Sequence, residues 1–212
     1  MHDMQNQTSI SGRLLIGITA LAAWFAVIGQ FYLNIKISEN SLGETITRYF
    51  SYFTILSNIM VAICSTAVLL NPGRNIFSRP KTMTAVAVYI LIVGIVYNLV
   101  LRNIWAPTGF QKLLDEMLHV GTPLLFVLNW FLFVPKYELQ WKDTLPWLSF
   151  PLIYCCFILI RGAASGFYPY PFMDVTAQGY QQVAINSTFI CAAFLFVSFL
   201  FILIGKFTGK RS

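Results

Sequence analysis

Six apolar runs, each long enough to cross a lipid bilayer, occupy most of this chain. A helix needs roughly 20 predominantly apolar residues to span the hydrocarbon core of a membrane. The runs cover residues 13–37, 49–70, 82–101, 113–134, 145–160 and 183–207. We therefore predict an all-α, polytopic membrane protein in which six transmembrane helices form a bundle.

The composition is that of a membrane protein. Hydrophobic residues make up 57% of the 212 residues and charged residues 10%, whereas a soluble domain carries about 25% charged residues. Little sequence lies outside the runs, and no linker or internal repeat is visible, so a single domain over residues 1–212 is expected. The first run is too long for the apolar part of a signal peptide and is expected to remain as a helix.

The basic residues predict the orientation of the bundle. Cytoplasmic loops of membrane proteins carry an excess of Lys and Arg. If the N terminus is cytoplasmic, nine basic residues fall inside and five outside, so both termini are predicted to be cytoplasmic. The inside set is Arg13, Arg74, Arg79, Lys81, Lys136, Lys142, Lys206, Lys210 and Arg211, and the outside set is Lys36, Arg48, Arg102, Lys112 and Arg161.

Several classes of partner and cofactor are excluded. The net charge of +6 comes from few, scattered residues that follow the membrane topology, so no nucleic-acid partner is predicted. Only His2 and His119 could supply imidazole ligands, too few for an ordinary zinc or di-iron site. No metal or other cofactor is predicted. The cysteines lie within the spans, where they are expected to act as small apolar residues without disulfides: Cys64, Cys155, Cys156 and Cys191.

His119 lies inside the fourth apolar run, one helical turn after Asp115. A histidine in hydrocarbon costs free energy, so it usually faces a protein or water-lined interior and has a function. Thr54 in the second run lies at a similar depth. It is about 9 Å along the helix from Arg48, and His119 is about 10 Å from Lys112, both counted from the outer face.

Other reactive side chains gather at the same outer side of the predicted bundle. Arg102 closes the third run, Arg161 closes the fifth, and Asn186 opens the sixth. Tyr170 and Asp174 lie in the loop between the last two runs. Polar groups at one depth predict a pocket that opens toward the outer leaflet.

The chemistry available in such a pocket is that of acyl transfer. A hydroxyl beside an imidazole, which a carboxylate or amide orients, is the general arrangement for a covalent nucleophile. Thr54 would supply the hydroxyl and His119 the base, while Asp115 or Asp174 could support or orient the histidine. Asn58, one turn from Thr54, could orient the hydroxyl or help to stabilise an oxyanion.

The same residues also have structural interpretations. Ser, Thr and Asn commonly hydrogen-bond between membrane helices, and Arg102 and Arg161 could extend to lipid headgroups. The segment 166–172, rich in aromatic residues and proline, could be an interfacial belt or a lid over the pocket. The residues expected to be interfacial anchors are Trp105, Trp130, Trp141 and Trp147.

Three short motifs form a recognisable pattern. They are Tyr52-Phe53-Thr54, Leu118-His119 followed by Pro123 and Asn129-Trp130-Phe131-Leu132-Phe133, and Tyr168-Pro169-Tyr170-Pro171-Phe172-Met173-Asp174. These motifs resemble those of the bacterial Pr-six-Pr membrane proteins, a resemblance that covers the chain in span count and order. More distantly, the chain is similar to the androgen-induced membrane hydrolases of animals, which cleave fatty-acid esters of hydroxy fatty acids.

The resemblance to the animal hydrolases implies a catalytic pair. In that family a threonine after Tyr-Leu and a histidine in a later span do the chemistry, and these positions match Thr54 and His119. Their Gly-x-Trp-x-Tyr-Pro-Phe-Leu-Glu segment is similar to residues 166–174, with Tyr168 in place of tryptophan and Asp174 in place of glutamate. The animal members carry no clear equivalent of Asp115 or Arg161. The bacterial resemblance implies a location in the inner membrane.

The leading interpretation is an intramembrane hydrolase of lipid esters, such as fatty-acid esters of hydroxy fatty acids. The substrate would enter from the outer leaflet, and Arg102 or Arg161 would hold a carboxylate or phosphate on it, with Tyr170 and Asn186 as further contacts. One alternative is a small-solute or proton-coupled transporter or channel. Another is a non-catalytic lipid-binding protein, which predicts that the Thr54 hydroxyl lies beyond hydrogen-bond reach of His119.

Overall fold

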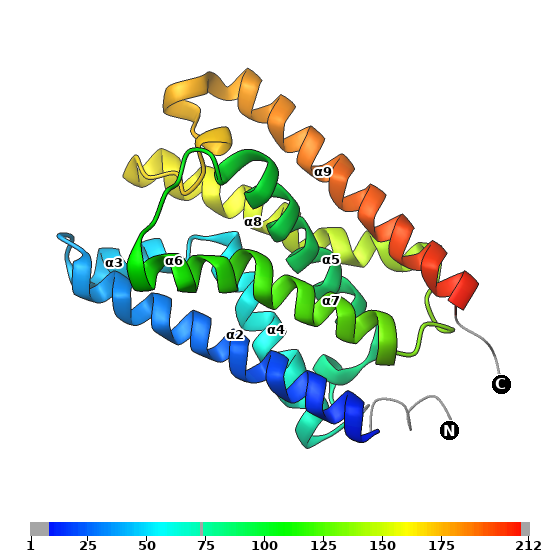
Figure 1. The fold of residues 1–212 in the computed structure, drawn as a ribbon. Helices are drawn as coiled ribbons and strands as arrows, with labels where there is room; N and C mark the ends of the chain where they lie inside the picture. The colour runs from blue at the N-terminus through cyan, green and yellow to red at the C-terminus, as the bar shows by residue number, and fades with distance from the viewer. Residues whose placement is uncertain (1–8, 73, 209–212) are drawn as a thin grey trace.

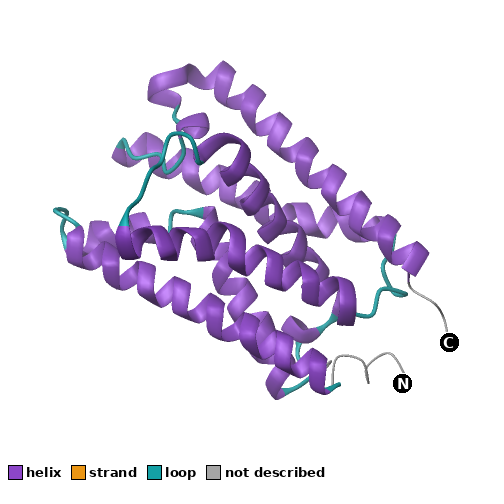
Figure 2. Cartoon of the chain, viewed as in Figure 1, coloured by secondary structure: helices purple, strands orange, loops and turns teal. Residues whose placement is uncertain are grey.

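The computed structural model describes residues 9–72 and 74–208 as helices joined by short loops (Figures 1 and 2). No strand occurs in these two ranges. Six helices are long and apolar enough to cross a membrane: Ile10–Ile37, Phe53–Leu70, Pro80–Leu101, Gly109–Phe133, Trp141–Ser165 and Val175–Thr208. The protein is an all-α, multi-pass membrane protein built as a six-helix bundle, as predicted. His2, Lys210 and Arg211 lie outside the described residues.

The second span begins later than predicted. The first span is α2 (Ile10–Ile37), and a short helix, α3 (Leu42–Tyr49), precedes α4 (Phe53–Leu70). Tyr49 therefore ends α3 instead of opening the span. Contacts with distant helices hold the intervening turn: the Tyr49 hydroxyl donates to the Val27 carbonyl at 2.6 Å, and the Tyr154 hydroxyl donates to the Ser51 carbonyl at 2.7 Å.

Two π-helical segments interrupt the third and fourth spans. The third consists of α5 (Pro80–Val96) and η2 (Tyr97–Leu101), and the fourth of α6 (Gly109–Glu116), η3 (Met117–Gly121) and α7 (Thr122–Phe133). In η3 the Thr122 N–H bonds to the carbonyl of Met117, five residues back. Pro123 explains this wider turn, because proline has no N–H and its ring excludes the carbonyl of the residue four back, His119.

The last two spans are longer than predicted. Helix α8 (Thr144–Ser165) continues past residue 160, so Arg161 lies inside it and does not end the span. Helix α9 (Val175–Thr208) bends at Gly179, whose φ of 77° lies in the left-handed region that glycine tolerates. Three short 3₁₀ turns complete the fold: η1 (Ile76–Ser78), η4 (Trp141–Asp143) and η5 (Pro171–Met173).

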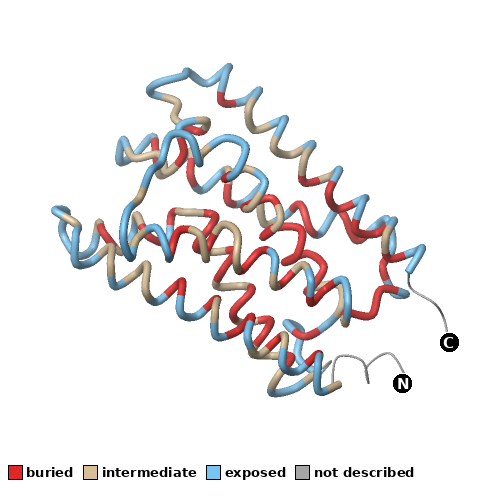
Figure 3. Tube along the Cα trace, in the orientation of Figure 1, coloured by how far each residue is buried: buried red, intermediate tan, exposed pale blue. Residues whose placement is uncertain are grey.

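The core follows the faces that the helices share (Figure 3). Helices α4 and α5 are central, with 61% and 56% of their most apolar stretches buried, whereas the fifth span buries 22%. Trp130 is 1% exposed and donates from Nε1 to the Thr84 hydroxyl at 2.8 Å. The prediction that Trp130 is an interfacial anchor is therefore wrong, because a hydroxyl inside the bundle satisfies its N–H. Trp147, 6% exposed, is also buried.

The ends of the described chain lie at one end of the bundle, where α2 begins and α9 ends (Figure 1). Helix α3, residues 102–108 and residues 166–174 lie at the opposite end (Figure 1). The loops that carry Arg102, Tyr170 and Asp174, which were predicted to lie on one outer side, therefore lie at the same end of the bundle.

Candidate active site

Thr54 and His119 meet between α4 and the fourth span. The Thr54 hydroxyl oxygen lies 3.3 Å from Nε2 of His119. Both groups are largely shielded from water, since Thr54 is 7% exposed and the His119 side chain 12%. The two residues predicted to share a depth are thus within hydrogen-bond reach of each other.

The surroundings of His119 determine its tautomer. Nδ1 lies 2.9 Å from the Asp115 carbonyl oxygen and 3.2 Å from Oδ1 of the same residue. Both neighbours are acceptors, so Nδ1 carries the proton in the neutral ring and Nε2 is left to accept from the Thr54 hydroxyl. Asp115 therefore lies where its predicted orienting role requires, with both its backbone carbonyl and its carboxylate close to Nδ1 of His119.

Tyr97 completes the support of the histidine and was not singled out in the sequence. Its ring stacks on that of His119, with centroids 4.0 Å apart and planes inclined by 13°. Its hydroxyl donates to Oδ2 of Asp115. Tyr97 begins η2 and His119 lies in η3, so both π-helical segments contribute to the site; such segments are frequent at functional sites.

The close approach of the third and fourth spans depends on a glycine. A Cβ atom at Gly94 would lie 3.2 Å from the His119 carbonyl oxygen and 3.5 Å from Cβ of Pro123. The first distance is tighter than ordinary van der Waals contact. Glycine at this position lets α5 lie directly against the turn that carries the histidine.

Tyr170 brings the segment before α9 to the same threonine. Its hydroxyl accepts from the Thr54 N–H at 3.3 Å and lies 3.4 Å from the Thr54 hydroxyl. Burial raises the pKa of Tyr170, so its phenol stays protonated. The predicted contribution of Tyr170 to the pocket agrees with this position beside Thr54.

Asn58 has a different environment from the one its predicted role needs. Its side-chain N–H groups donate to the Thr54 carbonyl at 2.9 Å and to the Leu118 carbonyl at 3.1 Å. Both donors that could stabilise an oxyanion are therefore occupied. Asn58 instead ties α4 to the turn that contains His119.

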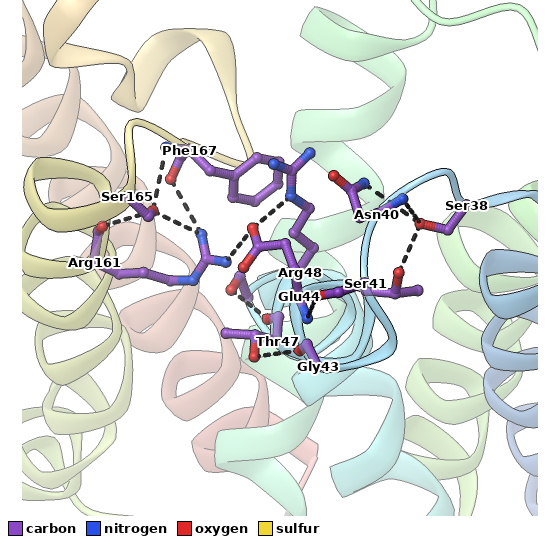
Figure 4. A network of polar contacts seen from close by, with 12 residues as sticks. Ser38, Asn40, Ser41, Gly43, Glu44, Thr47, Arg48, Arg161, Ser165 and Phe167 are labelled. Carbon is purple, nitrogen blue, oxygen red and sulfur yellow. Dashed lines mark hydrogen bonds and ion pairs between the residues drawn. The ribbon is translucent and has the colours of Figure 1, made fainter.

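Arg161 belongs to a network of polar contacts at the end of the bundle (Figure 4). Its guanidinium pairs with Glu44 at 3.2 Å and donates to the Phe167 carbonyl at 3.4 Å. Arg48 donates to the same Glu44 at 2.6 Å, and the two guanidinium groups lie 4.5 Å and 4.8 Å from the centre of the Phe167 ring. Arg161 thus holds the segment that carries Tyr170.

The remaining predicted site residues also have protein partners. Arg102 pairs with Glu116 at 2.7 Å. Asp174 accepts from the N–H groups of residues 176 and 177 and so caps α9. Asn186 donates to the Phe172 carbonyl and to the side chain of Gln178, both at 2.9 Å. Arg102, Arg161, Asp174 and Asn186 are not among the residues that line the two cavities at the site.

Thr54, His119 and Tyr170 stand between these two cavities and line both of them. The apolar cavity, about 830 Å³, lies among α4, α5, α8 and α9. Its walls include Ile92, Val96, Leu148, Leu152, Ile190 and Phe194. The polar cavity, about 1240 Å³, lies toward the bundle end with α3 and residues 102–108. Its walls include Gln30, Asn34, Trp105, Gln111, Asp115 and Pro169.

The groups at this site that can act chemically are the hydroxyls of Thr54 and Tyr170, the His119 imidazole and the Asp115 carboxylate. Within residues 9–72 and 74–208, no three His, Cys, Asp or Glu side chains gather closely enough to hold a metal ion. In comparisons with known proteins, no family model, curated protein or solved structure matches the chain.

Proposed function

We propose that this protein is an intramembrane hydrolase of lipid carboxylic esters, with Thr54 as the nucleophile and His119 as the general base. The observation that carries the proposal is the 3.3 Å distance between the Thr54 hydroxyl and Nε2 of His119, on a ring whose other nitrogen faces Asp115. A nucleophile, a base and an orienting group in contact are the signature of covalent acyl transfer. The motif resemblance to the androgen-induced hydrolases points to the same pair.

The reaction proceeds in two balanced halves. The Thr54 oxygen attacks the ester carbonyl carbon as its proton moves to Nε2 of His119. The C–O bond to the alcohol then breaks, and the histidine returns the proton to the departing alkoxide. A water molecule next attacks the acyl-threonine and gives its proton to His119. The fatty acid leaves, and the threonine oxygen recovers that proton.

Two groups stabilise the negative charge that develops on the carbonyl oxygen. The Tyr170 hydroxyl lies 3.4 Å from the Thr54 oxygen, close enough to donate to an oxyanion formed beside it. Thr54 is also the second residue of α4, an 18-residue helix whose N-terminal end favours negative charge.

The two cavities fit the two parts of a lipid ester. An acyl chain gains free energy by entering the apolar cavity, while the alcohol part remains in the polar one. Leu152, which is 51% exposed, forms part of the apolar wall and would face lipid, so that wall reaches the outside of the bundle. The distribution of basic residues favours a site toward the outer leaflet, and the resemblance to bacterial proteins favours the bacterial inner membrane. We propose that the substrate enters this site from the bilayer.

Other functions receive less support. A non-catalytic lipid-binding protein would not need a hydroxyl within reach of an oriented imidazole. A proton-coupled transporter or channel would use carboxylates free to exchange protons, but Glu116 pairs with Arg102 and Asp174 caps α9. The apolar cavity also lacks a line of ionisable groups that could carry protons onward from His119.

The test uses the full-length protein in detergent and in liposomes. Thr54→Ala and His119→Ala should each lower ester hydrolysis by at least about 100-fold, and a fluorophosphonate probe should label Thr54 in the wild type. Thr122→Val is the matched control, because the hydroxyl of this buried threonine has no hydrogen-bond partner among the described residues and Thr122 is not among the cavity-lining residues. Hydrolysis that persists in both alanine variants would rule out this function.

A further inference from the structure

We infer that the preferred substrate is an ester of a neutral, hydroxyl-bearing alcohol, such as a monoacylglycerol, in preference to one whose alcohol part carries a free carboxylate. The inference rests on the proposed function and concerns the polar cavity. Because Thr54 lies where the two cavities meet, an ester carbonyl held there has its acyl chain on one side and its alcohol on the other. The polar cavity therefore selects the alcohol.

Amide groups with unused hydrogen-bonding capacity line the polar cavity. The side chain of Gln30 donates to Oδ1 of Asn34 at 2.9 Å, which leaves the Gln30 oxygen and the Asn34 N–H groups without partners among the described residues. The Gln111 amide likewise has no partner within residues 9–72 and 74–208. All three side chains are half-buried. Hydroxyl groups match such a wall, because each can donate to the amide oxygens and accept from the amide N–H groups.

The charges around the same cavity disfavour a second carboxylate. Its described lining contains the carboxylate of Asp115 and no Lys or Arg. Both arginines near this cavity already have carboxylate partners. Arg48 pairs with Glu44, and Arg102, whose guanidinium lies 5.1 Å from the ring centre of the lining residue Tyr97, pairs with Glu116. Lys36 and Lys112 are exposed and lie outside the lining.

A carboxylate that enters this cavity would lose water and meet the like charge of Asp115, with no Lys or Arg in the described lining to pair with. A neutral polyol loses less on leaving water and regains hydrogen bonds from the amides. The lining thus discriminates against a substrate charge as well as offering partners to hydroxyls, the two ways in which a site achieves specificity.

The test compares three substrates with the same palmitoyl chain. They are monopalmitoylglycerol, the palmitate ester of hydroxystearic acid, and the same ester with the free carboxyl group of its hydroxystearic acid part converted to a primary carboxamide. The last two share one carbon skeleton and differ only in that a neutral carboxamide replaces the charged carboxylate. We expect kcat/KM for the glycerol ester and for the amide to exceed that for the carboxylate by about tenfold or more. This comparison uses the wild-type protein, so it does not depend on the folding of a variant.

A variant then tests the cavity itself. Gln111→Lys places a cation in the lining and should raise the ratio of carboxylate to amide hydrolysis by about tenfold. Gln182→Lys is the matched control, because Gln182 is an exposed residue of α9 outside the cavity lining. It should leave that ratio unchanged.

The outcomes separate the two levels of the proposal. The proposed substrate class is wrong, while the hydrolase proposal stands, in either of two cases. In the first, the ester with a free carboxylate is cleaved as fast as the ester with a carboxamide. In the second, Gln111→Lys leaves the ratio of these two rates unchanged. If no ester is cleaved and the probe does not label Thr54, the hydrolase proposal fails and the substrate class fails with it.

Discussion

Tyr97 lies flat against the imidazole of His119, with ring centroids 4.0 Å apart, and donates its hydroxyl to the carboxylate of Asp115. One side chain therefore fixes the plane of the histidine and also holds the group that orients it. This relationship joins residues of two spans, and it leads to the first prediction.

Tyr97→Phe should lower kcat by about tenfold with little change in KM, because the ring still stacks but Asp115 loses a donor. The acidic limb of the pH–rate profile should also move, a change that a merely structural role would not produce. Tyr89→Phe in the same span is the control, since the Tyr89 hydroxyl donates to the Trp147 carbonyl and Tyr89 lies outside both cavity linings. An unaltered kcat and pH profile in Tyr97→Phe would contradict the role given to Tyr97.

Pro123→Ala should reduce kcat by about tenfold or more while leaving the protein as stable or more stable. Alanine restores an N–H that can bond to the His119 carbonyl and lets the π-helical turn tighten into an α-helix, which rotates His119 away from Thr54. Steady-state kinetics and thermal unfolding measure the two effects. Pro146→Ala, in the first turn of α8, should affect neither strongly; full activity in Pro123→Ala would show that the wider turn is dispensable.

Glu44 should make the end of the bundle sensitive to acid. Its hydrogen bond from Arg48 lowers the pKa of its carboxyl, so its stabilising effect is fully present above the ordinary glutamate range and is lost as pH falls below about 4. The difference in melting temperature between wild type and Glu44→Gln should therefore be present at pH 7 and shrink below about pH 4. Glu39→Gln, at an exposed position, should show no such change. A constant difference across that range would exclude this linkage.

Lys136 should make the stability of the folded protein depend on pH in the alkaline range. Burial lowers the pKa of Lys136 to about 8, whereas an unfolded lysine titrates near about 10.4. Between these values the unfolded chain binds more protons than the folded one, so stability should rise with pH from about 8 to about 10. Thermal unfolding of Lys136→Met should lose this rise, and exposed Lys142→Met should keep it. If the wild-type melting temperature instead fell steadily over this pH range, and that of Lys136→Met fell in the same way, the role given to Lys136 would be contradicted.

The spans could be read from the sequence because apolar composition over about 20 residues is a local property. The errors arose where distant contacts decide the backbone or the surroundings. Residues 49–52 turn because the hydroxyl of Tyr49 and the carbonyl of Ser51 bond to other helices. Trp130 is buried because Thr84 satisfies its N–H, and no property of the sequence around Trp130 reveals that partner.

By itself the sequence determined the membrane class and the number of spans, because apolar composition depends only on position along the chain. It did not determine the depth of Thr54, because the count from Arg48 assumed one continuous helix, whereas Arg48 lies in α3 and Thr54 is the second residue of α4. The tertiary structure decided which side chains meet. Thr54 is separated by 65 residues from His119 and by 116 from Tyr170, and the rotation of each helix about its axis, which brings them together, is set by packing between spans. The same packing brings Tyr97 into contact with His119 and Arg161 into contact with Glu44.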